Sequence, residues 1–422
     1  MSDNAVEGKK VCKLIYVAVN DGKTKQSNKF YNMYEQGDGT FVAEWGRVEG
    51  RSDTKVYPMD KWDKTIKAKT KKGYQDVTDL FAEVVENGDG DNTLADISDR
   101  AIRQLMDLLQ NYANDSIAAN YTVSSKAVTQ KQVDSAQAKL DEIVELAKKG
   151  KSIAKLDEAL LELFHIIPRK MKDVRHHLFG DDEKPNAKIT AGILDDIQEA
   201  IADEQATLDV MAGQVMINEE TDEATEDRET TQTLLEMLGL EVTKAPKDQI
   251  DYVKDKMGPN RNQVRNVYMV VNKATQRKFD AHLDNAKDKH TRHFFHGSRN
   301  QNWLNIMSTG LLIRPAGAIH TGSMFGDGIY FADKAQKSIG YTSLSGSYWA
   351  RGGDSRGFLA LFHVHTGKWK KIRRAAPSLN GPQIAREGYD SVFAEGGADL
   401  RNNEYIVYNS NQCTISHLIE IA

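Results

Sequence analysis

Polar side chains stand inside three apolar, strand-like segments in the last third of the chain. They are His296 in FFHGS, Tyr330 in GIYFAD and Glu404 in NNEYIVY. Burying a polar or charged group costs free energy unless a hydrogen bond, an opposite charge or a bound substrate compensates. One such histidine or tyrosine alone is usually a satisfied core or edge residue. Three of them in neighbouring strand-like segments favour a site that uses an imidazole, a phenol and a carboxylate.

Short strands must position these groups, because β-branched and aromatic residues alternate with turn signals from His293 to the C-terminus. A helix-like run at 248–256 and a strand-like segment, VYMVVNK, precede this region. The strands expected after it are RHFFHGS, GIYFAD, GFLALFHV, DSVFAE, EYIVYN and ISHLIEI. The basic run KWKKIRR at 368–374 is interpreted as a solvated strand and turn and not as an import signal.

Two other regions precede the C-terminal strands. From Val11 to Tyr57, strand-like segments separated by turn clusters predict a small antiparallel sheet, followed by helical spacing from Trp62 to Lys69. From about Ser98 to Ala212 the apolar residues recur at the helical period, which predicts a helical domain. The acidic segment 219–229 lacks that periodicity and is interpreted as a solvated connector.

The C-terminal segments resemble the catalytic domain of the poly(ADP-ribose) polymerase family, whose hallmark is a His-Tyr-Glu triad on three strands of a mixed sheet. Several motifs carry the resemblance in the same order along the chain. They are FHGSR at Phe295–Arg299, MFGDGIYFAD at Met324–Asp333, KS.GY at Lys337–Tyr341, GYDSV at Gly388–Val392 and NEYIVY at Asn403–Tyr408. A single HG dipeptide would carry no weight, but this ordered set is specific.

The resemblance implies that NAD⁺ is the substrate and that Glu404 is the main catalytic residue. Cleaving the bond between nicotinamide and ribose gives the anomeric carbon oxocarbenium character, so the site must stabilise positive charge. In the family the glutamate binds a hydroxyl of this ribose, stabilises that charge and helps to deprotonate the acceptor hydroxyl. Asn402 and Asn403 precede Glu404 where chain-elongating members often carry Tyr-Asn, so branching and chain length are left open.

The other residues of the expected NAD⁺ site follow from the same motifs. By resemblance Gly297 offers its backbone to the nicotinamide carboxamide, because the missing Cβ allows close approach. Two aromatic rings can sandwich the nicotinamide, and the remaining side chains bind the carboxamide, the adenosine ribose or the adenine. The ring pair is Tyr330 and Tyr341, the carboxamide helpers are Ser298 and Ser338, the ribose ligands are His296 and Asn302, and Arg314 is assigned to the adenine.

The N-terminal sheet resembles the WGR domain, which contacts broken DNA strands in DNA-dependent members of the family. The motif Trp45-Gly46-Arg47 supplies a flat ring for stacking and a guanidinium fork for phosphate. Lys69 and Lys71 add attraction that does not depend on sequence, as do the lysines at 55, 61, 64, 67 and 72. The simpler alternative is that Trp45 is a core aromatic and that the lysines form a solvated face.

The helical region resembles the regulatory subdomain that covers the NAD⁺ site in the family until DNA binding loosens it, which would be allostery. The expected fold class is therefore multidomain α+β. It comprises a small antiparallel WGR domain at 8–88, an all-α regulatory domain at 97–215 and a mixed-sheet ADP-ribosyltransferase domain at 228–422. The implied activity is DNA-strand-break-dependent poly(ADP-ribosyl) transfer to the enzyme itself and to nearby proteins, by a monomer.

Composition sets limits on other classes of protein. The 422 residues carry a formal net charge of -5 and only two cysteines, Cys12 and Cys413, so a disulfide framework and a cysteine-rich zinc site are excluded. No metal is expected. No apolar run reaches the roughly 20 residues of a membrane-spanning helix, and the first residues lack a secretory signal. We expect a nuclear protein, or a cytoplasmic one in a prokaryotic or viral setting.

Two alternative functions stay open at this point. The first is a mono-ADP-ribosyltransferase that modifies protein or nucleic acid ends. The second is a catalytically silent scaffold that binds DNA ends, which the presence of all three triad residues disfavours. A NAD-linked dehydrogenase is set aside, because no G-x-G-x-x-G follows a strand and opens a helix with an acidic residue downstream.

Overall fold

The computed structural model describes residues 10–19, 26–81, 96–121, 128–180, 197, 200–201, 204–215, 233–313, 324–344 and 353–422. The chain divides into two compact units, which we describe separately. The sheet-and-bundle unit comprises residues 1–91 and 115–215, and the C-terminal unit comprises residues 92–114 and 216–422. The finer division into three domains stays a prediction.

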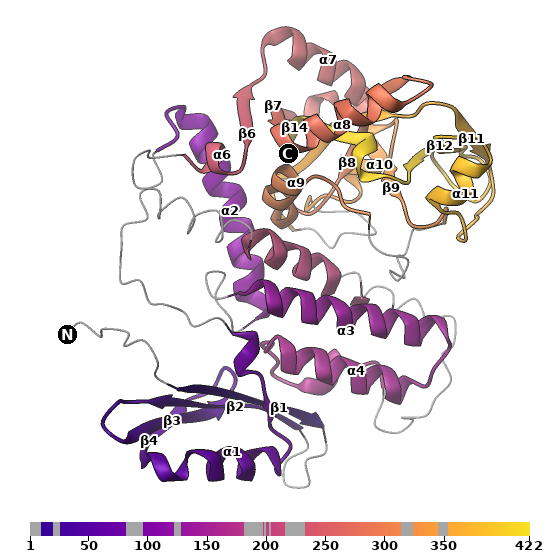
Figure 1. The fold of residues 1–422 in the computed structure, drawn as a ribbon. Helices are drawn as coiled ribbons and strands as arrows, with labels where there is room; N and C mark the ends of the chain where they lie inside the picture. The colour runs from indigo at the N-terminus through magenta and orange to yellow at the C-terminus, as the bar shows by residue number, and fades with distance from the viewer. Residues whose placement is uncertain are drawn as a thin grey trace. The chain divides into compact units, whose positions relative to one another are not determined.

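The sheet-and-bundle unit begins with a five-stranded antiparallel sheet in the order β4-β3-β2-β1-β5 (Figure 1). Alternate residues of the strands face helix α1 and bury Leu14, Met33, Phe41 and Trp62 in one cluster. The predicted sheet and helix are thus confirmed. The bounds are β1 Val11–Val19, β2 Gln26–Glu35, β3 Thr40–Arg47, β4 Ser52–Pro58, α1 Trp62–Thr70 and β5 Gln75–Asp76, with 3₁₀ turns at Met59–Lys61 and Thr78–Leu80.

The described residues of this unit beyond the sheet are mostly helical. They include α3 Gln130–Lys148, α4 Ile153–Ile166 and the helical residues 204–215, with a 3₁₀ turn at Val174–His177. A capping box in which Thr129 and Gln132 exchange hydrogen bonds begins α3. The imidazole of His165 links α4 to the sheet, because its Nε2 accepts the backbone N–H of Val17 at 3.1 Å. This bond gives the backbone N–H of Val17 a partner, because the pairing of β1 with the short strand β5 ends at Ile15.

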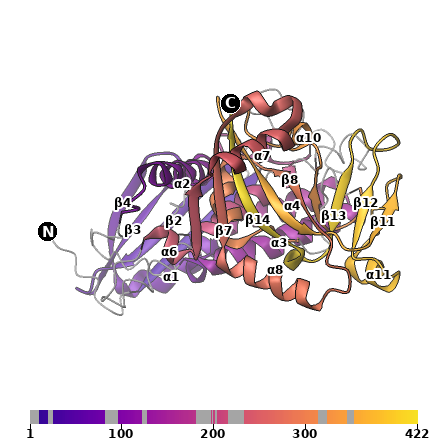
Figure 2. The ribbon, with the colours of Figure 1, turned by 90° about the horizontal axis from the view of Figure 1, so that it is seen from above.

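The C-terminal unit contains two sheets. One has five antiparallel strands in the order β6-β7-β14-β10-β8, and Figure 2 shows β7 and β14 side by side. The other has the order β11-β12-β13-β9, with β11 and β12 parallel. The strands are β6 Leu240–Lys244, β7 Val264–Asn272, β8 Thr291–Gly297, β9 Ile329–Phe331, β10 Gly357–His365, β11 Trp369–Ile372, β12 Ser391–Ala394, β13 Glu404–Val407 and β14 Cys413–Ile421.

These sheets divide the triad, so the expectation of one mixed sheet carrying all three residues is wrong. His296 lies on β8 in the five-stranded sheet, whereas Tyr330 and Glu404 lie on β9 and β13 in the four-stranded sheet. An isolated bridge between Phe295 and Ala332 joins the two sheets. Its two backbone hydrogen bonds, at 2.8 and 2.9 Å, bring the end of β9 against β8. Backbone pairing therefore brings His296 close to Tyr330, although the two residues are far apart in the sequence.

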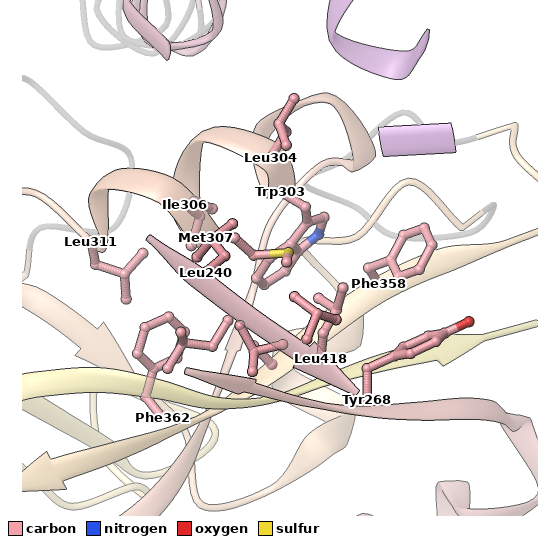
Figure 3. Packing of buried hydrophobic residues seen from close by; sticks show 14 of the residues in the cluster. Leu240, Tyr268, Trp303, Leu304, Ile306, Met307, Leu311, Phe358, Phe362 and Leu418 are labelled. Carbon is pink, nitrogen blue, oxygen red and sulfur yellow. The ribbon is translucent and has the colours of Figure 1, made fainter. Parts of the chain in front are cut away.

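The core of the C-terminal unit lies between the five-stranded sheet and helices packed on it. In Figure 3 Trp303 of α9 lies among Tyr268, Phe358 and Leu418 of the sheet, and it is fully buried. The first part of α2 (Arg100–Asn120) adds Ile102, Leu105, Met106 and Leu109 to the same core. The other helices are α6 Leu234–Met237, α7 Lys247–Met257, α8 Lys273–Asn285, α9 Trp303–Thr309, α10 Ala335–Ile339 and α11 Gly381–Arg386, with 3₁₀ turns at Gly258–Gln263, Asn300–Asn302 and Ser410–Gln412.

Candidate active site

Tyr330 and Glu404 point to the same face of the four-stranded sheet. Strands β9 and β13 pair antiparallel, with Tyr330 opposite Ile406, and alternate residues of a strand share a face. Glu404, two residues before Ile406, is therefore a diagonal neighbour of Tyr330. The phenol is fixed, since it donates a hydrogen bond to the carbonyl of Gly326 at 2.7 Å and accepts the N–H of Phe325 at 3.0 Å. Burial and the nearby charge of Glu404 raise the pKa of Tyr330.

The carboxylate of Glu404 is held at one oxygen only. Oε1 accepts a hydrogen bond from the ammonium group of Lys337 on α10, and the two form an ion pair. Oε2 is buried and has no hydrogen-bond partner within the described part of the chain, although only 6% of the residue is exposed. Burial raises the pKa of Glu404, and the positive charge of Lys337 opposes that rise. An unmet buried acceptor is costly, so Oε2 is suited to a substrate hydroxyl.

His296 presents an acceptor nitrogen. Its Nδ1 lies 3.1 Å from the carbonyl oxygen of Tyr330, and since a carbonyl can only accept, Nδ1 carries the proton. Burial lowers the pKa of His296, which favours the neutral imidazole with an unprotonated Nε2. Such a nitrogen can accept a hydrogen bond from a ribose hydroxyl, the role that the family resemblance implies.

Gly297 is required by packing against the protein itself. A Cβ built on it would lie 1.9 Å from the carbonyl oxygen of Ser338, a distance that no real side chain could adopt. The sequence analysis expected a ligand to approach Gly297 where a Cβ would stand. In the structure the atoms nearest to that position belong to the backbone of α10. The close approach brings Gly297 and Ser338, both assigned to the carboxamide, into direct contact.

The remaining predicted ligands lie around this contact. The Asn302 amide donates to Ser298 Oγ at 2.9 Å, while Asn302 Oδ1 is buried with no partner among the residues described. Tyr341 follows α10, its N–H bonds the carbonyl of Ser338 at 3.1 Å, and 39% of it is exposed. Burial and the charge of Glu404 raise the pKa of its phenol. Arg314 lies outside the described residues.

Sequence reasoning missed two polar residues that hold the site. Lys337 stands in the KS.GY motif but received no role, and it forms the ion pair with Glu404. Asn403 was noted only for its place before Glu404, yet its side chain bonds two other segments. The available signal was a lysine within a motif that the sequence analysis had already assigned to the catalytic domain. Within the described ranges no group of three or more His, Cys, Asp or Glu residues is arranged to hold a metal ion.

The four residues assigned to DNA lie on the sheet-and-bundle unit. The Trp45 ring is partly buried and stacks on Tyr31 at a centroid distance of 5.6 Å. The Lys69 ammonium lies 3.4 Å from the centroid of the Tyr31 ring, and burial lowers its pKa to about 8. Arg47 is exposed and its Nη2 donates to the carbonyl of Gln26 at 3.3 Å, whereas Lys71 is simply exposed.

Comparisons with known proteins agree with the C-terminal motifs. A family model described as Poly(ADP-ribose) polymerase catalytic domain matches residues 247–399. Poly [ADP-ribose] polymerase-like 100L of Invertebrate iridescent virus 6 is 30% identical over 181 residues, covering 41% of this chain and 94% of the viral protein. Poly [ADP-ribose] polymerase 2 of Homo sapiens is 32% identical over 164 residues, 32% of this chain and 27% of that protein. Poly [ADP-ribose] polymerase 1 of Xenopus laevis is 24% identical over 329 residues, 70% of this chain and 31% of that protein.

Proposed function

The chain belongs to the poly(ADP-ribose) polymerase family, and from this premise we propose that it is a poly(ADP-ribosyl)transferase activated by DNA strand breaks. It is an NAD⁺ ADP-ribosyltransferase, so the proposal concerns the polymeric product and the dependence on DNA. Its acceptors are itself and nearby proteins, and it acts as a monomer in the nucleus, or in the cytoplasm of a prokaryotic or virus-infected host. No helix within the described segments is long and apolar enough to cross a membrane.

One observation carries the catalytic part of the proposal: Glu404 has one oxygen fixed by Lys337 and one buried oxygen without a partner. When the bond between nicotinamide and ribose breaks, positive charge develops on the sugar, and a fixed carboxylate stabilises that charge more than it stabilises the substrate. Oε2 accepts a ribose hydroxyl of NAD⁺. The same carboxylate can then take the proton of an acceptor hydroxyl, because its pKa is raised above the usual value.

The other residues bind and orient the substrate. The neutral His296 accepts a hydrogen bond from the adenosine ribose through Nε2, and Asn302 contributes its unmet Oδ1 to the same sugar. The ring of Tyr330 is held by two hydrogen bonds of its hydroxyl, so it offers a rigid stacking face to nicotinamide at little entropic cost. Tyr341 supplies the second face, since its partial exposure leaves room for a ring to lie against it.

Removal of the Lys337 charge tests the role of Glu404 through pH dependence. Lys337 opposes the burial that raises the pKa of Glu404, so Lys337→Met should raise that pKa further. Because the ionised carboxylate is the active form, the acid limb of the pH profile of kcat should move to higher pH by roughly one to three units. NAD⁺ consumption measured from pH 5 to 9 gives the profile. Lys334→Met, an exposed change three residues earlier, serves as control, and an unshifted acid limb would argue against the ion pair.

DNA sensing is assigned to the sheet of the sheet-and-bundle unit. Arg47 is exposed at the end of β3, and Lys71 is exposed directly after helix α1. Trp45, two residues before Arg47, is partly buried and stacks on the buried Tyr31. Exposed cations attract nucleic acid backbones, and the partly exposed ring of Trp45 can stack on a sugar or base. Because Lys69 lies on the Tyr31 ring, on which Trp45 stacks, it holds that pair of rings in addition to contributing charge. A phosphate nearby would favour its protonated form.

An assay with labelled NAD⁺ tests both parts of the proposal. Nicked DNA should increase incorporation at least several-fold over the DNA-free reaction, and equal rates would remove the sensing function. Phosphodiesterase digestion should release internal phosphoribosyl-AMP units. Their absence would favour the alternative, mono-ADP-ribosyl transfer to protein or nucleic acid ends, which the departure from the family pattern at Asn402 leaves open. Arg47→Glu should weaken DNA binding and reduce the slope of log affinity against log salt by about one, whereas Lys131→Glu on α3 should not.

A further inference from the structure

The side chain of Asn403 ties together the ends of three strands in the four-stranded sheet. Its Oδ1 accepts the backbone N–H of Gly396, two residues past the end of β12, at 2.9 Å. Its Nδ2 donates to Oδ2 of Asp333, two residues past the end of β9, also at 2.9 Å. Asn403 itself immediately precedes β13, which begins with Glu404. One amide thus connects the segments that carry Tyr330 and Glu404.

Backbone pairing alone leaves Glu404 without support on one side. The pairing of β13 with β9 runs from Val407 to Tyr405, so Glu404 lies past its last pair. On the other side, Glu404 opposite Ala394 is the terminal pair of β13 with β12. Ends of short strands fray unless side chains tie them, because few backbone bonds hold them. The two bonds of Asn403 lie at that unsupported end.

We propose that Asn403 is a positioning residue, which fixes the backbone of Glu404 relative to Tyr330 so that the free carboxylate oxygen keeps its place beside the reacting sugar. The inference rests on the ADP-ribosyltransferase activity of the chain and not on DNA dependence or polymer formation. Loss of this tie should lower kcat, because the catalytic carboxylate is misplaced. It should leave the KM for NAD⁺ nearly unchanged, because His296, Gly297 and Asn302 belong to other elements.

The polarity of the two bonds provides a sharp test. Asn403→Asp keeps the shape but places a second carboxylate against Asp333, so the donor is lost and two negative charges face each other. Asp333→Asn alone still lets an amide oxygen accept from Asn403. In the double variant N403D/D333N, the new aspartate accepts from both Gly396 N–H and the amide at position 333. Both hydrogen bonds are then restored, and donor and acceptor are exchanged only in the bond between positions 403 and 333.

Steady-state NAD⁺ consumption by the full chain, with nicked DNA present throughout, measures the effect. We expect N403D to lose about 10- to 100-fold in kcat with KM changed less than about threefold, and the double variant to recover to within about threefold of the original. Asn402→Asp makes the same change one residue earlier, at a side chain that forms no hydrogen bond with the described residues, and should change kcat less than about twofold.

Thermal unfolding of each variant separates positioning from loss of the fold. N403D should remain folded well above the assay temperature, and the pH profile of its residual kcat should show a displaced acid limb. An N403D enzyme with the original kcat would overturn the proposal, as would a double variant no more active than N403D. If N403D does not fold, recovery in the double variant decides the question instead. Failure of DNA stimulation or of polymer formation would appear in the unaltered enzyme and would leave this comparison intact.

Discussion

Replacing Glu404 with glutamine is expected to lower the rate of ADP-ribosyl transfer by about 10³-fold or more, while NAD⁺ affinity changes by less than about threefold. Glutamine keeps the size of the side chain and an acceptor oxygen, so binding of a ribose hydroxyl can persist. It removes the negative charge and the base to which we assign stabilisation of the cationic sugar and deprotonation of the acceptor. Single-turnover transfer of labelled ADP-ribose and titration calorimetry with NAD⁺ measure the two quantities separately.

Two comparisons make this result specific. Glu387→Gln removes another carboxylate of the C-terminal unit, one that pairs with Lys370 at the surface, and should leave transfer unchanged. His296→Ala should show the opposite pattern, a loss of NAD⁺ affinity of about tenfold, because it removes the side chain that we propose as a ligand of the adenosine ribose. An E404Q enzyme that still produced the original ladder of products would show that another residue performs the catalytic step.

The sequence singled out the side chains of the candidate site but did not predict how the strands that carry them come together. His296, Tyr330 and Glu404 stand out because each is polar within an apolar strand, a local property that the order of residues records. Their division between two sheets depends on the bridge from Phe295 to Ala332, which is a pairing between segments far apart in the chain. Lys337 received no role for the same reason, because a lysine is usually exposed and only its contact with Glu404 in the folded chain indicates a function.

Helix α2 illustrates a similar limit for the fold. The apolar period from Ile102 to Tyr112 correctly predicted a helix with one buried face. Periodicity shows that a face is covered but does not identify what covers it. In the structure Ile102, Leu105 and Leu109 pack into the core of the C-terminal unit, although the helix continues into residues of the other unit. A domain boundary predicted from a change in the hydrophobic pattern therefore need not coincide with the boundary between the packed units.

Introduction of a single methyl group at Gly297 should disable the site as a whole. In Gly297→Ala the new Cβ would lie 1.9 Å from the carbonyl oxygen of Ser338, so α10 must move away from β8. Helix α10 also carries Lys337, and Tyr341 bonds the same carbonyl through its N–H, so the partner of Glu404 and one stacking ring would move with it. Overpacking of this kind costs about 1–3 kcal/mol.

The expected result is a fall of about 100-fold in kcat/KM, with kcat and NAD⁺ affinity both reduced, unlike the separate effects of E404Q and H296A. Gly353→Ala is the matched control, because a Cβ there meets no atom of the described residues within 4 Å and the change should be tolerated. NAD⁺ consumption and calorimetry on both variants provide the comparison. An active G297A enzyme would mean that β8 and α10 can separate without cost, and the contact that joins His296 and Gly297 to the Lys337–Glu404 pair would then not define the site.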